Sequence, residues 1–579
     1  MKVISRHPDK GYLDSMLWVP KHLINVTATQ SALSFLFTDS YSKQQRVLCL
    51  WKETTHHLLV PRAFWEVGSL PCEVVDCRPK RYTEIDFKSR IKLDHRPGTD
   101  NVLLPTGSNV QQLSIKAMQE SMGGVLQLAC GMGKTLVALE KIAQGRVPAL
   151  VLVDNTNLLE QWLDDVIEFL DVPGGVGVVG AGKFDWQKGL VLATYQTLAQ
   201  RADEMPEEVR RWFGQIFWDE AHHINAPTFS KTADLFYGQR YALTATPRRD
   251  DGLHIICDFH IGRVLHRDLR QPMKARLIFK WTGLELDLTD PRVSQAVLDV
   301  NGEIHTSKVP GYFGQWRNRL WMILQDCVDA INAGRKTLVL SNSVDEVINL
   351  MTLWTRGAHA DLYTDVPVPT PAEVGWNVQP LNLSHFEVKK IKKLIETAWR
   401  AVAQGKQLNI PFVNDTMQLY QQHLASKAIV NEHGRRQRDF LKQLLTEQSG
   451  SGLMTFGVPA KRRQEFLRER PVVFAITKYG KEGLDCPDLD TVLVSTLFSG
   501  KNALQQLMGR PTRPKAGKKK PMVVFYVDNV GQYHGMSQKL MGHLRNWSHE
   551  EGGPFEYELL GYPKVSTCKA SSLTTAFGQ

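Results

Sequence analysis

The chain has 579 residues, of which 42% are hydrophobic and 22% charged, a balance that is ordinary for soluble globular proteins and excludes a disordered or fibrous chain. No apolar run reaches the roughly eighteen residues that a membrane-spanning helix needs, and the 8 cysteines are too scattered for a disulfide framework or a zinc finger. We therefore expect a soluble, intracellular protein of roughly three or four domains. The net charge of +10 fits a polyanionic partner, but it also fits a surface charged only for solubility.

The first region of the chain, residues 1–105, contains short β-like runs, several prolines and aromatic residues, and little helical periodicity. Such a composition favours strands joined by turns over packed helices. We predict a small accessory domain there, of the β or α+β class.

Two later regions alternate short apolar runs, rich in Val, Leu and Ile, with helical stretches. Apolar strands that alternate with helices are typical of parallel sheets covered on both faces, so we predict an α/β fold with two such domains in tandem. Within the second domain, helical spacing of apolar residues predicts a helical insertion. The predicted division is 1–105 accessory domain, 106–270 first α/β domain, 271–315 connector, 316–530 second α/β domain with the insertion at about 365–450, and 531–579 C-terminal extension.

A glycine-containing segment, Leu128–Thr135, lies between an apolar strand pattern and a helical one. Glycines at these positions let backbone N–H groups curl around a phosphate at a helix N-terminus, while a lysine and a hydroxyl reach the outer phosphates and Mg²⁺. The usual pattern starts with Gly or Ala, and here it starts with Leu128. The residues that we expect to bind ATP are Gly131, Met132, Gly133, Lys134 and Thr135, with Thr135 also a ligand of Mg²⁺.

Two adjacent carboxylates, Asp219 and Glu220, follow the apolar run Ile216–Trp218. A strand end that carries such a pair suits ATP hydrolysis, because one carboxylate holds Mg²⁺ through water and the other activates the attacking water. We assign the metal to Asp219 and the water to Glu220. Together with Lys134, these residues predict ATP hydrolysis.

Further segments in the same order resemble those of superfamily 2 helicases of the DEAH-box type. Leu243–Pro247 looks like their motif III, so the resemblance assigns the coupling of hydrolysis to movement to Thr244 and Thr246. Leu152–Trp162 is similar to motif Ia. The resemblance also implies an adenine-reading glutamine upstream, for which Gln112 is the candidate and Gln111 competes.

The resemblance continues in the second domain. Leu338–Asn342 is similar to motif IV, the segments Phe474–Thr477 and Glu482–Pro487 to motif V, and Gln505–Arg513 to motif VI. It implies two RecA-like domains that close on ATP, with arginines of the second domain stabilising charge on the γ-phosphate. The residues that the resemblance adds to the ATP site are Asp485, Gln506, Arg510 and Arg513.

Within the superfamily the chain looks closest to the XPB and UvsW group of DNA helicases, on segments such as Leu128–Gly131 and Thr246–Gly252. The resemblance implies a cytoplasmic or nucleoid-associated motor on single-stranded, forked or branched DNA, for repair or recombination, with RNA less favoured and no membrane partner. It also implies that residues 1–105 engage DNA. A motor grips phosphates rather than bases. The expected strand contacts are Thr194, Tyr195, Gln196, Ser341, Asn342 and Thr477.

Three alternatives remain open from the sequence. An RNA helicase has the same motor, and a motor subunit of a restriction or defence complex would need a nuclease on a partner chain. A clamp that binds ATP without turnover is disfavoured by the presence of Lys134, Asp219, Glu220, Arg510 and Arg513.

Overall fold

The structure is a computed structural model. The residues that it describes are 6–560 without 39–43, 96–108, 130, 181, 222–225, 246–253, 271–272, 299–301, 303, 306–307, 358–361, 363–449, 482–485, 499, 514, 516 and 551–554. The predicted helical insertion lies almost wholly outside these residues. The chain divides into two compact units, one formed by Met1–Ala275, Ser499–Pro521 and Leu540–Glu556, the other by Arg276–Phe498, Met522–Lys539 and Tyr557–Gln579.

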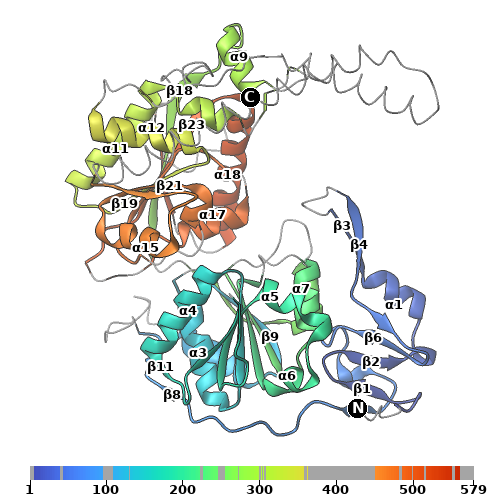
Figure 1. The fold of residues 1–579 in the computed structure, drawn as a ribbon. Coiled ribbons are helices and arrows are strands. Elements are labelled where there is room, and N and C mark those ends of the chain that lie inside the picture. The colour runs from blue at the N-terminus through green and yellow to red at the C-terminus, as the bar shows by residue number, and fades with distance from the viewer. Residues whose placement is uncertain are drawn as a thin grey trace, which may run out of the picture. The chain divides into compact units, whose positions relative to one another are not determined.

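An 8-stranded sheet forms the centre of the first unit (Figure 1). Its strands are parallel apart from β13, which pairs antiparallel with β12. The α/β fold predicted for this part of the chain is confirmed. In sheet order the strands are β13 (Lys183–Phe184), β12 (Val176–Gly180), β14 (Leu190–Thr194), β10 (Ala149–Val153), β15 (Gln215–Asp219), β16 (Gln239–Thr244), β9 (Gly123–Leu128) and β17 (Val264–Asp268).

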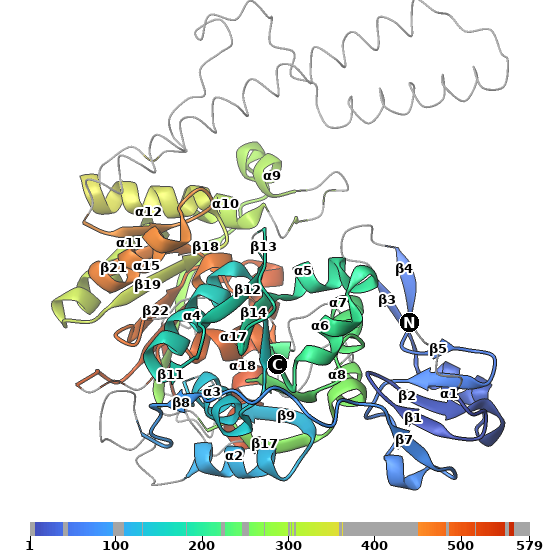
Figure 2. The same cartoon turned by 60° about the horizontal axis from the view of Figure 1, so that its bottom comes forward.

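The two faces of this sheet bury alternate residues of its strands. Leu150 and Leu152 of β10 belong to one hydrophobic cluster, and Val151 and Val153 belong to another. Because both faces are covered, the strands are continuous apolar runs without polar alternation. Figure 2 shows α2 and α3 beside β9 and β17. The helices are α2 (Val110–Gln119), α3 (Lys134–Gly145), α4 (Thr156–Phe169), α5 (Tyr195–Gln200), α6 (Glu207–Trp212), α7 (Ala226–Ala233), α8 (His254–Ile261) and the 3₁₀ turn η3 (Ala202–Glu204).

The N-terminal region contains a 5-stranded mixed sheet and a separate two-stranded hairpin. Strand β1 pairs parallel with β7, and the other pairs are antiparallel. The predicted β or α+β character is confirmed. The elements are the sheet strands β5 (Lys52–Glu53), β6 (His57–Val60), β2 (Leu17–Pro20), β1 (Gly11–Leu13) and β7 (Val74–Asp76), the hairpin β3 (Ser34–Thr38) and β4 (Gln45–Cys49), helix α1 (Val26–Ala32), and the 3₁₀ turns η1 (Lys21–Leu23) and η2 (Val67–Ser69).

The N-terminal sheet shares its core with the central sheet of the first unit. Leu17 and Val60 of the small sheet belong to the same hydrophobic cluster as Leu150 and Trp218. The continuous core indicates that this region does not hang from the first unit on a flexible linker.

Two arginines join the main chains of the small and large sheets. Arg240 of β16 is fully buried and donates to the carbonyl oxygens of Ser15 (2.6 Å), Phe236 (3.0 Å) and His260 (3.0 Å). Arg62 donates to the carbonyl oxygens just before β16. Burial lowers the pKa of Arg240 to about 10, so the guanidinium stays charged at neutral pH.

After β7 the chain runs along the first unit towards α2. The amide of Ile85 donates to the carbonyl of Arg146, and Phe87 is buried in the core beneath α3 and α4. A short antiparallel pair, β8 (Lys88–Ser89) with β11 (Leu170–Asp171), fixes the next residues. The end of the predicted accessory region is therefore packed against the first α/β sheet.

A 7-stranded sheet forms the centre of the second unit, with strand order β20-β21-β19-β22-β23-β18-β24. Strand β18 comes from the predicted connector, where Ala275–Glu285 pairs parallel with β23. The strands are β20 (Gly452–Met454), β21 (Val472–Ile476), β19 (Thr337–Ser341), β22 (Thr491–Val494), β23 (Met522–Asn529), β18 (Ala275–Glu285) and β24 (Phe555–Leu560). The helices of the second unit are α9 (Pro291–Val297), α10 (Val309–Phe313), α11 (Arg317–Asn332), α12 (Val344–Arg356), α15 (Ala460–Glu469) and α16 (Thr477–Lys481). Helix α17 (Lys501–Met508) belongs to the first unit, and α18 (Gly531–Glu550) is divided between the two units.

We predict that Arg240→Met strongly destabilises the first unit. The change leaves buried carbonyl oxygens without their charged donor, which costs about 3 kcal/mol or more. Lys52→Met is the control, because Lys52 pairs with Asp234 from a side chain that is 61% exposed, and such a pair contributes less than about 1 kcal/mol. Urea unfolding measures both variants, and equal losses would contradict the structural role of Arg240.

Candidate functional site

Three neighbouring parallel strands bring the predicted site residues to one edge of the first sheet. In the register of β15, β16 and β9, Asp219 lies opposite Leu243, which lies opposite Leu126. The chain then leaves β9 into the glycine loop and β15 into Glu220. Carboxyl ends of parallel strands are where α/β proteins bind ligands. Thr244 ends β16 at this edge and is buried, whereas Thr246 lies outside the described residues.

The glycine loop requires glycine for two physical reasons. Gly131 and Gly133 have φ angles of +84° and +76°, which side-chain-bearing residues rarely adopt. A Cβ on Gly133 would lie 2.3 Å from Nε2 of Gln111. Helix α3 begins directly after it at Lys134, and no side chain caps its N-terminus. The first N–H groups of α3 therefore suit an anion such as a nucleotide phosphate.

The side chain of Gln111 holds the glycine loop in place through hydrogen bonds. Its Nε2 donates to the carbonyl of Met132 at 3.1 Å, and its Oε1 accepts from the amide of Asp94 at 2.7 Å. The carboxylate of Asp94 in turn accepts from the amides of Gln111 and Gln112, where α2 begins. Gln111 is fully buried and Gln112 exposed, so the two competing glutamines differ in position: one holds the loop and the other faces solvent.

Buried partners hold Asp219 in place. Nε1 of Trp162 donates to Oδ2 of Asp219 at 2.8 Å, and the Tyr195 hydroxyl donates to the Asp219 carbonyl at 2.8 Å. Both aromatic side chains are 1% exposed. Trp162 was not predicted as a site residue, although it ends the segment that resembles motif Ia.

The charges of this edge act on one another. Burial, and next the Glu220 carboxylate, raise the pKa of Asp219 to about 6, against the opposing effects of Trp162 and Lys134. Nζ of Lys134 lies 4.0 Å from Oε1 of Glu220 and 3.4 Å from the carbonyl of Leu128. Glu220 has a φ of +46°, a strained conformation for a residue with a side chain, and such strain gathers at functional sites. A cation beside the carboxylates would favour their charged forms.

The predicted strand contacts of the first unit differ in exposure. Thr194 is buried, and its hydroxyl hydrogen-bonds that of Thr197 at 2.8 Å. Tyr195 is buried with its hydroxyl on Asp219. Gln196 is exposed and reaches Asp154 at 3.4 Å. A nucleic-acid strand on this surface would therefore meet the side chain of Gln196 rather than that of Tyr195.

The expected nucleic-acid contacts of the second unit also differ in exposure. Ser341 ends β19 with a fully buried hydroxyl, and Asn342 is exposed. Thr477 begins α16 and is buried, and its Oγ1 has no hydrogen-bond partner among the residues that the structure describes.

Motifs V and VI are only partly described. Arg510 and Arg513 follow α17 and are half-buried. Gln506 lies in α17, but its side chain is outside what the structure describes, and Asp485 lies wholly outside the described residues.

Among the described residues there are two large, mainly parallel sheets, and the first carries a glycine loop and an acidic pair at the same edge. This arrangement resembles that of superfamily 2 helicases, and sequence comparisons relate the chain to them. A family model described as "Type III restriction enzyme, res subunit" matches residues 104–249. Among the described residues, no helix has the length and apolarity needed to cross a membrane.

Three relatives narrow the class. The chain is 25% identical to "DNA 3'-5' translocase XPB2" of Sulfurisphaera tokodaii over 70% of this chain and 78% of that protein. It is 37% identical to "DNA 3'-5' helicase XPB" of Kineococcus radiotolerans over 22% of this chain and 24% of the relative. It is 31% identical to "Putative ATP-dependent RNA helicase L396" of Acanthamoeba polyphaga mimivirus over 30% of this chain and 34% of the relative. Within superfamily 2, this protein is related to the XPB helicases.

We predict that Trp162→Phe lowers the ATP hydrolysis rate about 10- to 100-fold, the usual effect of removing a hydrogen-bond partner of a carboxylate that holds a metal ion, which is the role expected of Asp219. The ring stays in the core, but Oδ2 of Asp219 loses its donor. Trp212→Phe is the matched control, because Nε1 of Trp212 donates to the carbonyl of Lys188, away from Asp219. Steady-state ATPase rates compare the variants. If both lose activity alike, the contact between Trp162 and Asp219 has no special role.

Proposed function

We propose that this protein is an ATP-driven motor that moves along DNA or remodels it. The observation that carries the proposal is the meeting of the glycine loop and the pair Asp219–Glu220 at one edge of the first sheet. The second parallel sheet supplies the other lobe that a superfamily 2 motor needs. ATP hydrolysis at the first sheet drives a movement of the two sheets relative to one another, which moves the protein along DNA.

The ATP phosphates bind at the N-terminus of α3. Main-chain groups of Gly131, Met132 and Gly133 surround them, and Lys134 adds its charge. Glu220 orients and deprotonates the attacking water. An adenine contact falls to the exposed Gln112, because the amide of Gln111 is already bonded at both ends.

The same edge suits Mg²⁺. No cluster of three or more His, Cys, Asp or Glu side chains that would hold a metal ion occurs among the described residues. Mg²⁺ commonly keeps several waters and binds one or two protein oxygens together with substrate phosphates. The hydroxyl of Thr135 would bind the ion and the carboxylate of Asp219 would hold it through water, and the ion would neutralise charge on the phosphates.

Residues of the second α/β region complete the ATP site in this proposal. Arg510 and Arg513 stabilise charge on the γ-phosphate, with Gln506 and Asp485 beside them. Thr244 and Thr246 couple hydrolysis to movement. The spacing of these residues in the sequence supports these roles.

DNA binds through its phosphates at Gln196 of the first unit and Asn342 of the second. Both side chains are exposed within two residues of the end of a parallel strand. In this proposal Thr194 and Tyr195 of the first unit, and Ser341 and Thr477 of the second, contribute main-chain groups. The relatives from Sulfurisphaera tokodaii and Kineococcus radiotolerans are named as a DNA translocase and a DNA helicase, which supports DNA as the substrate.

RNA is the second candidate substrate. The mimivirus relative is named as a putative RNA helicase, and its match covers about the same share of this chain as several named for DNA. Because the motor grips phosphates, the choice of nucleic acid rests on contacts outside the ATP site.

We predict that single-stranded or forked DNA strongly stimulates ATP hydrolysis, and that RNA does so weakly. Lys134→Ala and Glu220→Gln should each lower the stimulated rate about 100-fold or more, because each removes a group that stabilises the transition state. Lys188→Ala is the control, because Lys188 is a half-buried lysine that donates to the carbonyl of Gly174. Equal stimulation by RNA would favour the second candidate, and no stimulation by either would exclude a nucleic-acid motor.

We predict that the Mg²⁺ requirement rises in acid. Asp219 has a pKa raised to about 6, and its protonated carboxyl cannot hold the ion. Above pH 7 the half-saturating Mg²⁺ concentration should therefore be constant, and below the pKa it should increase about tenfold for each unit of pH. Initial ATPase rates at varied Mg²⁺ between pH 5 and 8 measure it. A half-saturating Mg²⁺ concentration that does not change between pH 5 and 8 would show that Asp219 does not hold the ion.

A further inference from the structure

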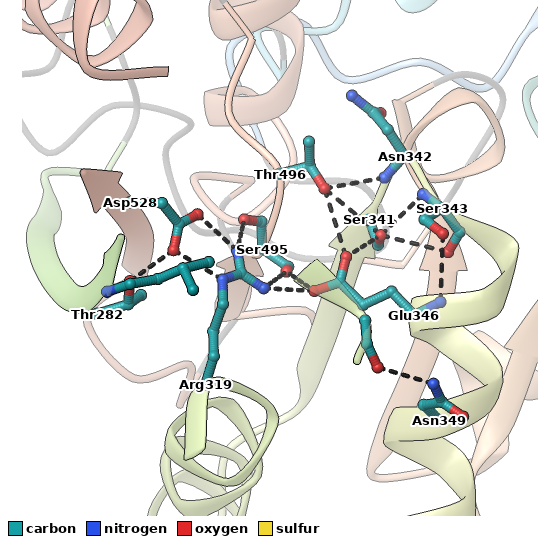
Figure 3. A network of polar contacts seen from close by, with 12 residues as sticks. Thr282, Arg319, Ser341, Asn342, Ser343, Glu346, Asn349, Ser495, Thr496 and Asp528 are labelled. Carbon is teal, nitrogen blue, oxygen red and sulfur yellow. Dashed lines mark hydrogen bonds and ion pairs between the residues drawn. The ribbon is translucent and has the colours of Figure 1, made fainter. Parts of the chain in front are cut away.

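A buried polar cluster ties together the carboxyl ends of three neighbouring strands of the second sheet. We name it the Arg319 cluster, and Figure 3 shows it. Strands β19, β22 and β23 are adjacent and parallel, so their carboxyl ends lie side by side. Its members are Arg319 of α11, Glu346 of α12, Ser341 at the end of β19, Ser495 and Thr496 after β22, and Asp528 of β23.

Arg319 uses every N–H of its guanidinium within the cluster. Nε and Nη2 donate to the carboxylate of Asp528 at 2.8 and 3.0 Å. Nη1 donates to Glu346 at 2.5 Å and to the Ser495 hydroxyl at 2.9 Å, and Nη2 donates to the Ser495 carbonyl at 2.6 Å. The planar fork thus fixes three chain segments in one geometry, which a lysine with a single ammonium cannot copy.

Glu346 connects the guanidinium of Arg319 to the turn after β19. It is the third residue of α12, and its amide donates to the N-cap Ser343, the start of a capping box. Its carboxylate does not return to the Ser343 amide but accepts from the hydroxyls of Ser341 and Thr496. The Ser341 hydroxyl then accepts from the Ser343 amide at 2.9 Å, and the Thr496 hydroxyl accepts from the Asn342 amide at 3.2 Å. The backbone amides of Asn342 and Ser343 are therefore both held by hydrogen bonds.

The cluster decides what this turn displays. Ser341 and Thr496 are fully buried, whereas Asn342 between them is exposed. Figure 3 shows the Asn342 side chain pointing away from the cluster. Because hydrogen bonds to Ser341 and Thr496 hold the backbone of this turn, the exposed side chain of Asn342 points in a fixed direction.

Stability alone is a weak reason for such a cluster. Arg319 is 1% exposed, Glu346 0% and Asp528 1%, so two carboxyl groups and one guanidinium leave water together. Apolar residues of similar volume often give equal or greater stability than a buried ionic group, and the ionic group then serves to fix one arrangement.

We propose that Arg319 is a positioning residue for nucleic-acid binding: through Glu346 and Ser495 it holds the turns after β19 and β22 so that Asn342 meets a phosphate of the bound strand. The inference rests on the proposed function. Arg319 itself touches no nucleic acid, because its side chain is enclosed by the cluster and by the Phe313 ring at 4.6 Å.

The test uses a neutral version of the cluster, because Arg319→Met alone would strand two buried carboxyl groups and disrupt folding. The triple variant Arg319→Met, Glu346→Gln, Asp528→Asn removes all charge at nearly constant volume. Asn342→Ala removes the displayed side chain, and a quadruple variant combines both. Asp326→Asn is the matched control, because Asp326 also lies on α11 and binds Lys280 and Tyr526 away from this edge.

ATPase rates of the full chain are measured against the concentration of single-stranded DNA, with the melting temperature of each variant. We expect the triple variant and Asn342→Ala each to raise the half-saturating DNA concentration about fivefold, the loss of one well-placed hydrogen bond, while the maximal rate falls less than twofold. The quadruple variant should be no worse than either, since both changes remove the same contact. Asp326→Asn should bind DNA as the unaltered chain does.

Two results would overturn the inference while leaving the proposed function intact. One is full additivity in the quadruple variant, and the other is a triple variant that melts earlier and loses maximal rate without a change in half-saturating DNA. If the triple variant does not fold, Arg319→Lys takes its place in the same comparison, with the same expected non-additivity. Absence of DNA stimulation in the unaltered chain would instead sink the proposed function.

Discussion

Parallel pairing of β15, β16 and β9 is the constraint on which the rest of the structure depends. It sets Asp219 level with the last residues of β9, so that the glycine loop and the acidic pair leave the sheet at the same edge. The second sheet repeats the principle, because its parallel strands bring Ser341, Ser495 and Asp528 to one edge. In both sheets a buried network holds the strand ends and leaves few groups facing outward.

The fold could be predicted to the level of its sheets because buried parallel strands are read directly as apolar runs. Ala149–Val153 and Thr491–Val494, for example, are short runs rich in Val and Leu, and both form fully buried strands. Strand β18 escaped prediction, since Ala275–Glu285 mixes Lys, Arg and Trp with apolar residues near the edge of its sheet. The fusion of the N-terminal sheet with the first unit also escaped, because the contacts of Arg240 join residues far apart in sequence.

For the site, the sequence predicts which segments meet but not which way each side chain points. Gln111 and Gln112 are equivalent as letters, and only the direction of α2 decides that Gln111 braces the loop. Tyr195 and Ser341 are both expected to contact the nucleic acid, yet their hydroxyls turn inward to Asp219 and Glu346. Trp162 lay in a recognised segment, but nothing in its spacing shows a bond to Asp219.

The most direct test is an experimental structure of the chain with a non-hydrolysable ATP analogue, Mg²⁺ and a short DNA strand. We predict that the outer phosphates lie at the N-terminus of α3 against Lys134, with Glu220 facing the γ-phosphate and the guanidinium groups of Arg510 and Arg513 on it. A triphosphate bound elsewhere, or bound at this loop with both guanidinium groups directed away from it, would contradict the motor.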